Sequence, residues 1–414
     1  MRTNSQSTKN TNWKKNTILF LTSQSISLFG SSIVQYAIIW YITLTTGSGI
    51  MMTISTLCGF LPQILISIFA GVWADRYNKK FLIMVSDSCI AISTLVVAIF
   101  FLSGFDSIWL LFVGLAIRSL GSGVQSPTVN AMIPQIVPEK HFMRVNALNA
   151  TFQSLIMIAS PAISAILMNT MSIGNIFFVD VITAIIGVLV FSFIKVSHTS
   201  NFNKGEKINY FSDFKDGLVY IKNNKFIRTF LMFFALLYLG CAPLCFLSPL
   251  LVTRSYGEEV WRLTANEILF FVGTIVGGGI MSSWGGFKNK IYTIILSCLS
   301  FGVCSIVMGS GFNFIVYLIF MAISGIGMAF MGSPSTVVLQ ESVEESMQGR
   351  VFAIDQILAS GIMPLSMLIY GPLADKFSVE ALLIFTGIAG LILTVAMFMN
   401  KTLVKGYKIP EKSN

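Results

Sequence analysis

The chain has 414 residues, of which 54% are hydrophobic and only 11% are charged, and its mean hydropathy is +0.78. A soluble protein of this length needs far more charge to cover its surface, so the composition excludes that class. The net charge of +9 could indicate a nucleic-acid partner, but the placement of the basic residues argues against one.

Apolar runs of about 20 residues recur along the chain, and a helix of that length crosses roughly 30 Å of hydrocarbon. We count about twelve such runs, near residues 17–44, 50–70, 81–103, 107–130, 145–170, 174–195, 226–252, 265–284, 290–310, 313–338, 350–373 and 379–400. The sequence therefore predicts an all-α integral membrane protein with twelve transmembrane helices.

The basic residues between these runs fall almost entirely on the side of the membrane that holds both termini. Only Arg254, Arg262 and Lys376 are expected on the opposite side. This asymmetry follows the positive-inside rule and places both termini in the cytoplasm. The excess of positive charge thus reports membrane topology, and we expect a bilayer but no nucleic acid as partner.

A long polar interval divides the predicted helices into two halves. Residues 1–195 should form an N-terminal six-helix bundle, and residues 226–414 a C-terminal six-helix bundle with a short cytoplasmic tail. Within the linker 196–225, apolar side chains recur at near-helical spacing at Phe211, Phe214, Leu218 and Ile221. This spacing indicates either an amphipathic helix on the inner membrane surface or a simple linker.

A repeated motif indicates internal duplication. Residues 59–62 (Gly-Phe-Leu-Pro) lead to 71–77 (Gly-x-x-Ala-Asp-Arg-Tyr), and residues 361–364 (Gly-Ile-Met-Pro) lead to 371–377 (Gly-x-x-Ala-Asp-Lys-Phe). By the helix count, the first copy ends inside and the second outside. Such a pair is expected of three-helix units nested with inverted topology inside each half.

The charged stretch 71–80 resembles the loop between helices 2 and 3 of the major facilitator superfamily, G-x-x-[AS]-D-R-x-x-[RK]-[RK]. More narrowly, the chain resembles the bacterial macrolide-efflux branch. That resemblance rests on Trp13-Lys14, Gln24-x-x-Ser27-Leu28, Gln35, Thr46-Gly47-Ser48, Gly59-Phe60-Leu61-Pro62, Ile117-Arg118-Ser119, Ser160-Pro161-Ala162 and Gly349-Arg350-Val351-Phe352. It implies a drug:proton antiporter of the bacterial plasma membrane that confers antibiotic resistance by exporting hydrophobic drugs, typically macrolides.

The resemblance also implies a cytoplasmic gate. In the family, the acid of the loop sits against the N-terminus of helix 11, where the helix dipole favours a carboxylate. The gating residues carried over to this sequence are Gly71, Asp75, Arg76, Lys79, Lys80, Gly349 and Arg350. The alternative is a basic loop that only sets topology.

Proton coupling needs a group that changes charge along the transport pathway. Both histidines fall in predicted cytoplasmic segments, so the candidates are the carboxylates Asp87, Asp180 and Asp355. Arg118, in the middle of predicted helix 4, matches an arginine that the family associates with proton transfer. The alternative for each acid is an interfacial residue or a hydrogen bond at a helix end.

The substrate chamber should be lined by predicted helices 1, 4, 7 and 10. An abundance of Met and Phe suits a deformable apolar cavity for a bulky hydrophobic ligand, although most such residues in a membrane protein face lipid or other helices. The cavity candidates are Gln24, Gln35, Tyr36, Asn130, Tyr238, Phe246, Met328 and Met331.

Other classes of function find little support in the sequence. The phosphate-binding motif G-x-x-x-x-G-K-[ST] is absent, so an ATP-driven pump would need a partner ATPase, which the proposed mechanism does not require. No nucleophile with its base and no metal-ligand pattern occurs, and the six cysteines fit buried apolar positions. We therefore expect no enzyme, no cofactor and no metal, and a monomer. The alternatives to drug export are an exporter of a siderophore or other endogenous metabolite, a proton-coupled importer, and a transporter-like sensor.

Overall fold

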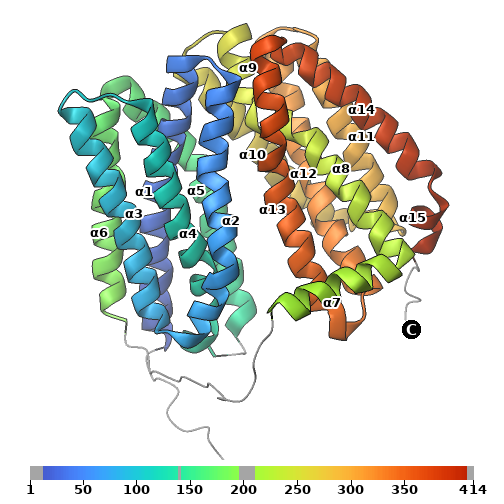
Figure 1. Cartoon of the computed structure of the whole chain (residues 1–414), viewed down its shortest axis with the longest axis horizontal. Coiled ribbons are helices and arrows are strands. Elements are labelled where there is room, and N and C mark those ends of the chain that lie inside the picture. Colours follow the sequence, from blue (N-terminus) through green and yellow to red (C-terminus); the bar gives the residue numbers. More distant parts are fainter. Residues whose placement is uncertain (1–12, 139–140, 195–209, 408–414) are drawn as a thin grey trace, which may run out of the picture. The chain divides into compact units, whose positions relative to one another are not determined.

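The computed structural model describes residues 13–138, 141–194 and 210–407 (Figure 1). Helices α1 to α15 and no strand occur within these ranges. Their bounds are α1 Trp13–Thr46, α2 Gly49–Arg76, α3 Lys79–Leu102, α4 Ile108–Ile136, α5 Phe142–Thr170, α6 Ile173–Ser192, α7 Tyr210–Asn223, α8 Lys225–Phe246, α9 Ser248–Ser255, α10 Val260–Trp284, α11 Lys290–Gly309, α12 Phe314–Ser342, α13 Glu345–Lys376, α14 Val379–Met399 and α15 Lys401–Gly406.

Twelve spans within the described residues are long and apolar enough to cross a membrane, which confirms the predicted helical membrane fold. Eleven of them are single helices, whereas the seventh span, Lys225–Ser255, consists of α8 and α9. The break falls at Leu247, between Pro243 inside α8 and a proline at the start of α9. Proline lacks a backbone N–H and cannot complete the helical hydrogen-bond ladder, which explains the interruption here.

The described residues divide into two compact units. The first contains those before Ile42 together with those between Cys58 and Ile194, and the second contains Ile42–Leu57 and those from Tyr210 onwards. The C-terminal turn of α1 and the first turns of α2 therefore belong to the second unit, while the rest of both helices belongs to the first.

In the first unit, α3 packs against α4 and α6 (Figure 1). A buried apolar cluster joins α1, α3, α4, α5 and α6, and its largest members are Phe20, Ile83, Met132 and Phe191, each no more than 1% exposed. Apolar side chains on facing sides of several helices bury one another, so this cluster gives the first unit its core.

In the second unit, α10 packs against α12, and α11 packs against α12 and α14. Small residues allow the backbones of α10 and α12 to approach closely. A Cβ atom added at Gly273 would collide with the carbonyl oxygen of Ala322, and one added at Gly325 would collide with that of Phe270. Close contact through small residues is a common way to pack helices in membranes, where burial from water does not drive association.

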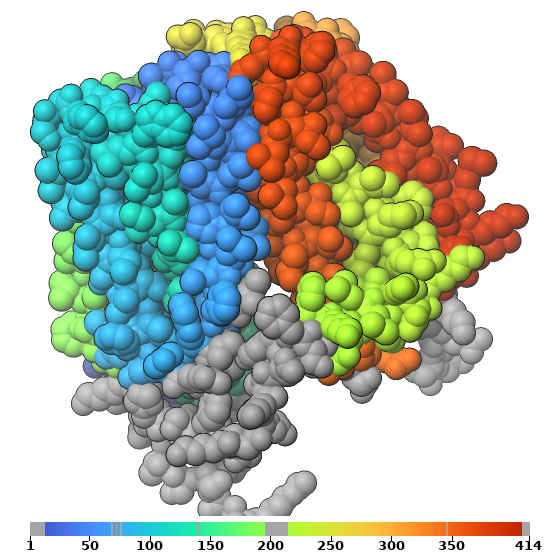
Figure 2. All heavy atoms as spheres, viewed as in Figure 1, coloured from blue at the N-terminus to red at the C-terminus, as the bar shows by residue number. Residues whose placement is uncertain are grey.

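Part of the linker forms the amphipathic helix α7, which packs against α13 and α8 (Figure 1, Figure 2). Gly217 is buried against Arg350 and Ile354 of α13, whereas Phe214 and Leu218 are more than 40% exposed. The side chain of Phe211 lies outside the described residues. Two described residues of the apolar face are thus exposed, and the position of α7 on a membrane surface stays a prediction.

Candidate functional site

A buried ion pair lies in the first unit, between Arg118 on α4 and Asp180 on α6. The two residues are 5% and 0% exposed, and Nη1 of Arg118 donates a hydrogen bond to Oδ2 of Asp180. Thr94 of α3 donates to the same oxygen at 2.8 Å, and Ser31 of α1 donates to Oδ1 at 2.6 Å. Arg118 also donates to the carbonyl oxygen of Ser31 at 3.0 Å. Four helices thus meet around one neutralised pair of charges, as burial of charge in a membrane protein requires.

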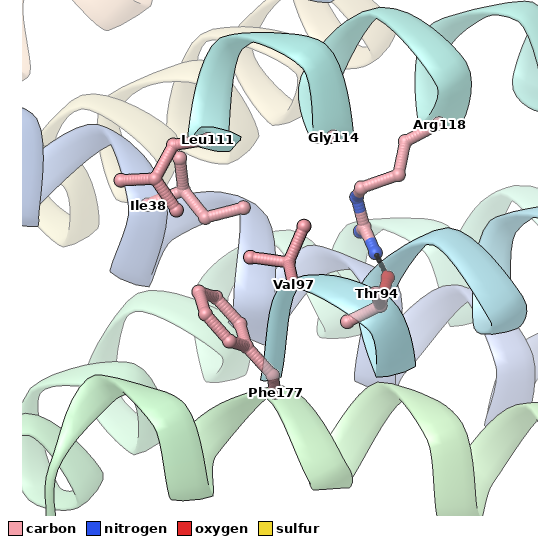
Figure 3. Close-up of a pocket in the computed structure, with 7 residues that line it drawn as sticks. All are labelled: Ile38, Thr94, Val97, Leu111, Gly114, Arg118 and Phe177. Atoms are coloured by element: carbon pink, nitrogen blue, oxygen red, sulfur yellow. Dashed lines mark hydrogen bonds between the residues drawn. The ribbon is translucent and has the colours of Figure 1, made fainter. Parts of the chain in front are cut away.

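A small cavity borders this pair, and Figure 3 shows the side chain of Arg118 reaching across to Thr94 beside it. The other lining residues are Ile38, Val97, Leu111, Gly114 and Phe177. Its empty volume of about 190 Å³ is below the roughly 300–1,000 Å³ of a ligand pocket. This cavity is therefore too small for a bulky drug.

Asp87 on α3 has a different environment from Asp180. It is 3% exposed, and its Oδ1 accepts hydrogen bonds from Ser27 Oγ and Gln125 Nε2, both at 2.7 Å. The same amide of Gln125 lies 3.4 Å from Oε1 of Gln24. Among the residues that the structure describes, no Lys or Arg forms an ion pair with Asp87. The hydrogen-bond donors to its carboxylate are therefore neutral polar groups.

Asp355 on α13 is the third predicted carboxylate. It is half-buried, and its Oδ1 is a buried atom without a hydrogen-bond partner in the described part of the chain. Asp87 and Asp180 belong to the first unit and Asp355 to the second. The three acids thus have different surroundings. Asp180 is paired with a cation, Asp87 accepts from neutral donors, and Asp355 has a buried oxygen without a described hydrogen-bond partner.

The predicted gating residues are placed only in part. Gly71 and Gly349 are exposed and Lys79 is half-buried. The side chains of Asp75 and Arg76 lie outside the described residues, so the latch stays a prediction.

Two basic residues of the predicted gate do have contacts in the structure. The ammonium group of Lys80 donates to the carbonyl oxygens of Ser192 and Ile194, at 2.6 and 2.8 Å. A cation is stabilised there by the C-terminal end of α6. Arg350 lies 3.9 Å from a carboxylate oxygen of Asp216 on α7. Both side chains therefore have structural contacts, whatever their part in gating.

The substrate-cavity candidates are spread over both units. Gln24 lies beside the Asp87 network, Asn130 is exposed, and Met331 is only 2% exposed inside the second unit. The half-buried candidates are Gln35, Tyr36, Tyr238, Phe246 and Met328. Tyr36 contacts the ring of Trp40, with centroids 5.6 Å apart. Among the described residues, Gln24 joins the hydrogen-bond network of Asp87, and Tyr238 lies close enough to Asp355 to interact with its charge.

Several polar residues that bind the predicted carboxylates were not predicted from the sequence. Ser27 and Gln125 bind Asp87, and Thr94 binds Asp180. A further ion pair, in the second unit, joins Arg254 to Asp375 with a nitrogen–oxygen distance of 3.1 Å. The repeated Gly-x-x-Ala-Asp motif is the one signal in the sequence that could have drawn attention to Asp375.

Comparison with known proteins agrees with this architecture. The family model of the Major Facilitator Superfamily matches residues 20–366. A macrolide efflux protein A of Streptococcus pyogenes is 27% identical over 385 residues, which cover 92% of this chain and 94% of the relative. The protein of the same name from Enterococcus faecalis is 26% identical over 78% of this chain and all of its own length. The staphyloferrin A transporter of Staphylococcus aureus is 22% identical over 93% of this chain and 96% of its own.

Solved structures share the fold at low sequence identity. A mutant of the nucleoside transporter NupG superposes with a TM-score of 0.73 at 12% identity, over 94% of this chain and 99% of its own. A POT family transporter bound to 5-aminolevulinic acid also has a TM-score of 0.73, at 13% identity, over 93% of this chain and 95% of its own. The family match, together with twelve helices in the described part of the chain that are long and apolar enough to span a membrane, identifies a multi-pass membrane transporter and not an enzyme. The chain belongs to the Major Facilitator Superfamily.

Proposed function

We propose that this chain exports macrolide-like hydrophobic drugs from a bacterial cell in exchange for protons, by alternating access. The relatives named macrolide efflux protein A support the substrate class, because they match 78–92% of this chain. In the cell, the transporter would lie in the plasma membrane as a monomer with both termini in the cytoplasm. The structural observation that carries the coupling part of the proposal is the buried, cation-free carboxylate of Asp87.

Asp87 is assigned the role of proton carrier because a proton can be added there without breaking an ion pair. Both neighbouring donors, Ser27 and Gln125, reach Oδ1, so a proton on Oδ2 leaves both hydrogen bonds in place. The side chain can therefore alternate between a charged and a neutral form with little rearrangement, and coupled transport requires such an alternation.

Asp180 is assigned a different role. A proton on its carboxylate would leave the buried guanidinium of Arg118 without its counterion, which is costly at this depth. Asp180 thus holds Arg118 in place, and Asp355 remains the second candidate for proton binding.

The predicted cytoplasmic latch completes the cycle. In this proposal, Asp75 and Arg76 act at the N-terminal end of α13, near Gly349 and Arg350, and Gly71, Lys79 and Lys80 shape the loop. A contact present in only one state shifts the equilibrium between the two states of the transporter.

Accumulation of radiolabelled erythromycin in a drug-sensitive bacterium tests the proposal. Cells that express the chain should accumulate less drug, and a protonophore should restore the level of control cells. Asp87→Asn should abolish the protonophore-sensitive part, whereas Asp106→Asn, at an exposed acid between α3 and α4, should not. Equal accumulation with and without the verified membrane protein would exclude macrolide export.

A siderophore or another endogenous metabolite is the second candidate substrate. The similarity to the staphyloferrin A transporter favours it. Secretion of siderophore into iron-limited medium, compared between cells with and without the chain, separates the two candidates. Increased secretion without any change in erythromycin accumulation would favour the metabolite.

A further inference from the structure

Asp375, in the last turn of α13, caps the beginning of α2. Its Oδ1 accepts a hydrogen bond from the backbone N–H of Gly49 at 2.6 Å. Its Oδ2 accepts from the N–H of Ile50 at 2.9 Å and from Oγ of Ser48 at 2.8 Å. The first N–H groups of a helix have no partner within the helix, and its positive dipole end favours an anion. All of these groups lie within the second unit, which includes Ile42–Leu57.

Arg254, in the last turn of α9, completes the arrangement with the opposite charge. Its guanidinium donates to the carbonyl oxygen of Gly47 at 2.5 Å, just after α1 ends, and to that of Ala374 at 2.6 Å, in the last turn of α13. It also lies 3.1 Å from Oδ1 of Asp375. The C-terminal ends of helices favour cations, so each charge faces helix ends of the complementary sign.

Backbone contact between α2 and α13 accompanies these charges. A Cβ atom added at Gly49 would collide with the carbonyl oxygen of Gly371, and one added at Gly371 would collide with Oγ1 of Thr53. That hydroxyl donates to the carbonyl oxygen of Met367 at 2.8 Å. Only glycine permits this approach, and Thr53 lies directly within the contact.

The same spacing of glycines occurs in the other copy of the repeat. Gly349 precedes Gly371 by 22 positions, and Gly49 precedes Gly71 by the same number. Each copy carries its aspartate four positions after the second glycine. Gly49 and Gly371 are in contact, whereas a Cβ atom at Gly71 or at Gly349 would meet no described atom within 4 Å. One glycine pair of the inverted repeat is thus tightly packed, whereas neither glycine of the other pair has such a contact with a described atom.

We propose that Asp375, Arg254, Ser48 and the crossing of Gly49 with Gly371 form a hairpin latch that holds one of the two states of alternating access. Since α1 crosses the membrane once, the α1–α2 turn lies on the face opposite the start of α1, and the latch acts on that face. A transporter of this fold opens its binding site alternately to the two faces, so the hairpin latch must break and re-form in each cycle. The inference rests on the family and the contacts, not on the substrate.

Labelling of a cysteine introduced by Thr53→Cys tests the hairpin latch without any substrate. The full-length chain, with its six native cysteines replaced, is purified in detergent and treated with a water-soluble maleimide. In the latched state the side chain at position 53 is buried, because Thr53 is only 4% exposed. Labelling is therefore expected to be slow and limited by opening of the latch.

Asp375→Asn removes the charge that binds the N-terminus of α2, and Arg254→Gln removes its counterpart. Each should raise the labelling rate by about tenfold, as expected when a charge-assisted contact at a helix end is lost. The matched control is Lys376→Gln, which removes an exposed charge from the same turn of α13 and should leave the rate unchanged.

A purely structural cap gives a different result. In that case Asp375→Asn would lower the melting temperature but label at the rate of Lys376→Gln, and this outcome would overturn the proposal. Where Asp375→Asn does not fold, Ser48→Ala removes a single hydrogen bond of the latch. It should give a smaller increase of about threefold, and no increase in that variant would equally overturn the proposal.

Discussion

Arg118 on α4 and Asp180 on α6 form an ion pair in which both side chains are at least 94% buried. The two residues are 62 positions apart in sequence, and Thr94 and Ser31 supply further hydrogen bonds to the pair. Such a pair tolerates the loss of both charges better than the loss of one, because a single remaining charge stays buried without compensation.

Arg118→Met should destabilise the protein by about 3–5 kcal/mol, since it leaves Asp180 charged and unpaired. The double variant Arg118→Met with Asp180→Leu should recover much of that loss. Thermal unfolding of the purified variants in one detergent measures both effects. A double variant as unstable as the sum of the single variants would show that the two residues do not act as a pair.

Substrate binding should release protons from the wild-type chain, because the proposed exchange requires drug and proton to compete. Asp87→Asn should release none, since the side-chain amide has no proton that titrates near neutral pH. Proton release on addition of erythromycin can be followed with a pH-sensitive dye in weakly buffered detergent solution. The control is Asp106→Asn, at an exposed acid of the same unit, and loss of the signal in that variant too would argue against a specific role for Asp87.

Gly325→Ala should destabilise the second unit by about 1–3 kcal/mol, because the new methyl group collides with the carbonyl oxygen of Phe270 on α10. Gly240→Ala is the matched control within the same unit, since a Cβ atom there meets no described atom within 4 Å. Alanine favours a helix over glycine by about 1 kcal/mol, so the control should be neutral or slightly stabilising. Thermal unfolding of both variants checks this contrast, which would be absent if α10 and α12 packed loosely.

Tyr407, after α15, should contribute a stabilisation that is lost only at high pH. Its hydroxyl donates to the carboxylate of Glu341, and burial together with that carboxylate raises the pKa of Tyr407 above its usual value of about 10. A raised pKa means that the stabilisation is complete below pH 10 and declines as the pH approaches the higher folded-state value.

Tyr407→Phe should therefore unfold at a lower temperature than the wild type, by a free-energy difference of about 1–2 kcal/mol at pH 7. The difference should stay constant between pH 7 and about 9.5 and shrink above about pH 10. Melting temperatures of both proteins across this range give the test. A difference that grows towards high pH would contradict the expected sign.

The twelve spans and the helical membrane fold could be predicted from the sequence because apolar runs of membrane length are a strong signal. The break at Leu247 was not predicted, although two prolines mark it in the sequence, because the run around them is otherwise continuously apolar. Helix ends also differ from those predicted by a few residues. For example, α10 begins at Val260, whereas the sequence predicted a start near residue 265.

Individual polar residues were predicted, but their partners were not. Arg118 and Asp180 were both candidates for proton coupling, yet their pairing depends on how α4 and α6 are rotated about their axes, which the sequence does not reveal. Asp375 appeared only as part of a repeat. Its contact with the N-terminus of α2 requires that a helix turn more than 300 positions away lies beside it.

The hydrogen bonds of Asp87 have a consequence for drug resistance itself. Because Ser27 and Gln125 both bind Oδ1, an asparagine can keep these bonds and place its amide where a protonated acid would carry its hydrogen. Asp87→Asn therefore resembles a permanently protonated transporter. Such a transporter would let drug equilibrate across the membrane in either direction but could not concentrate it on one side, so one atom exchanged in a side chain would turn a pump into a passive carrier.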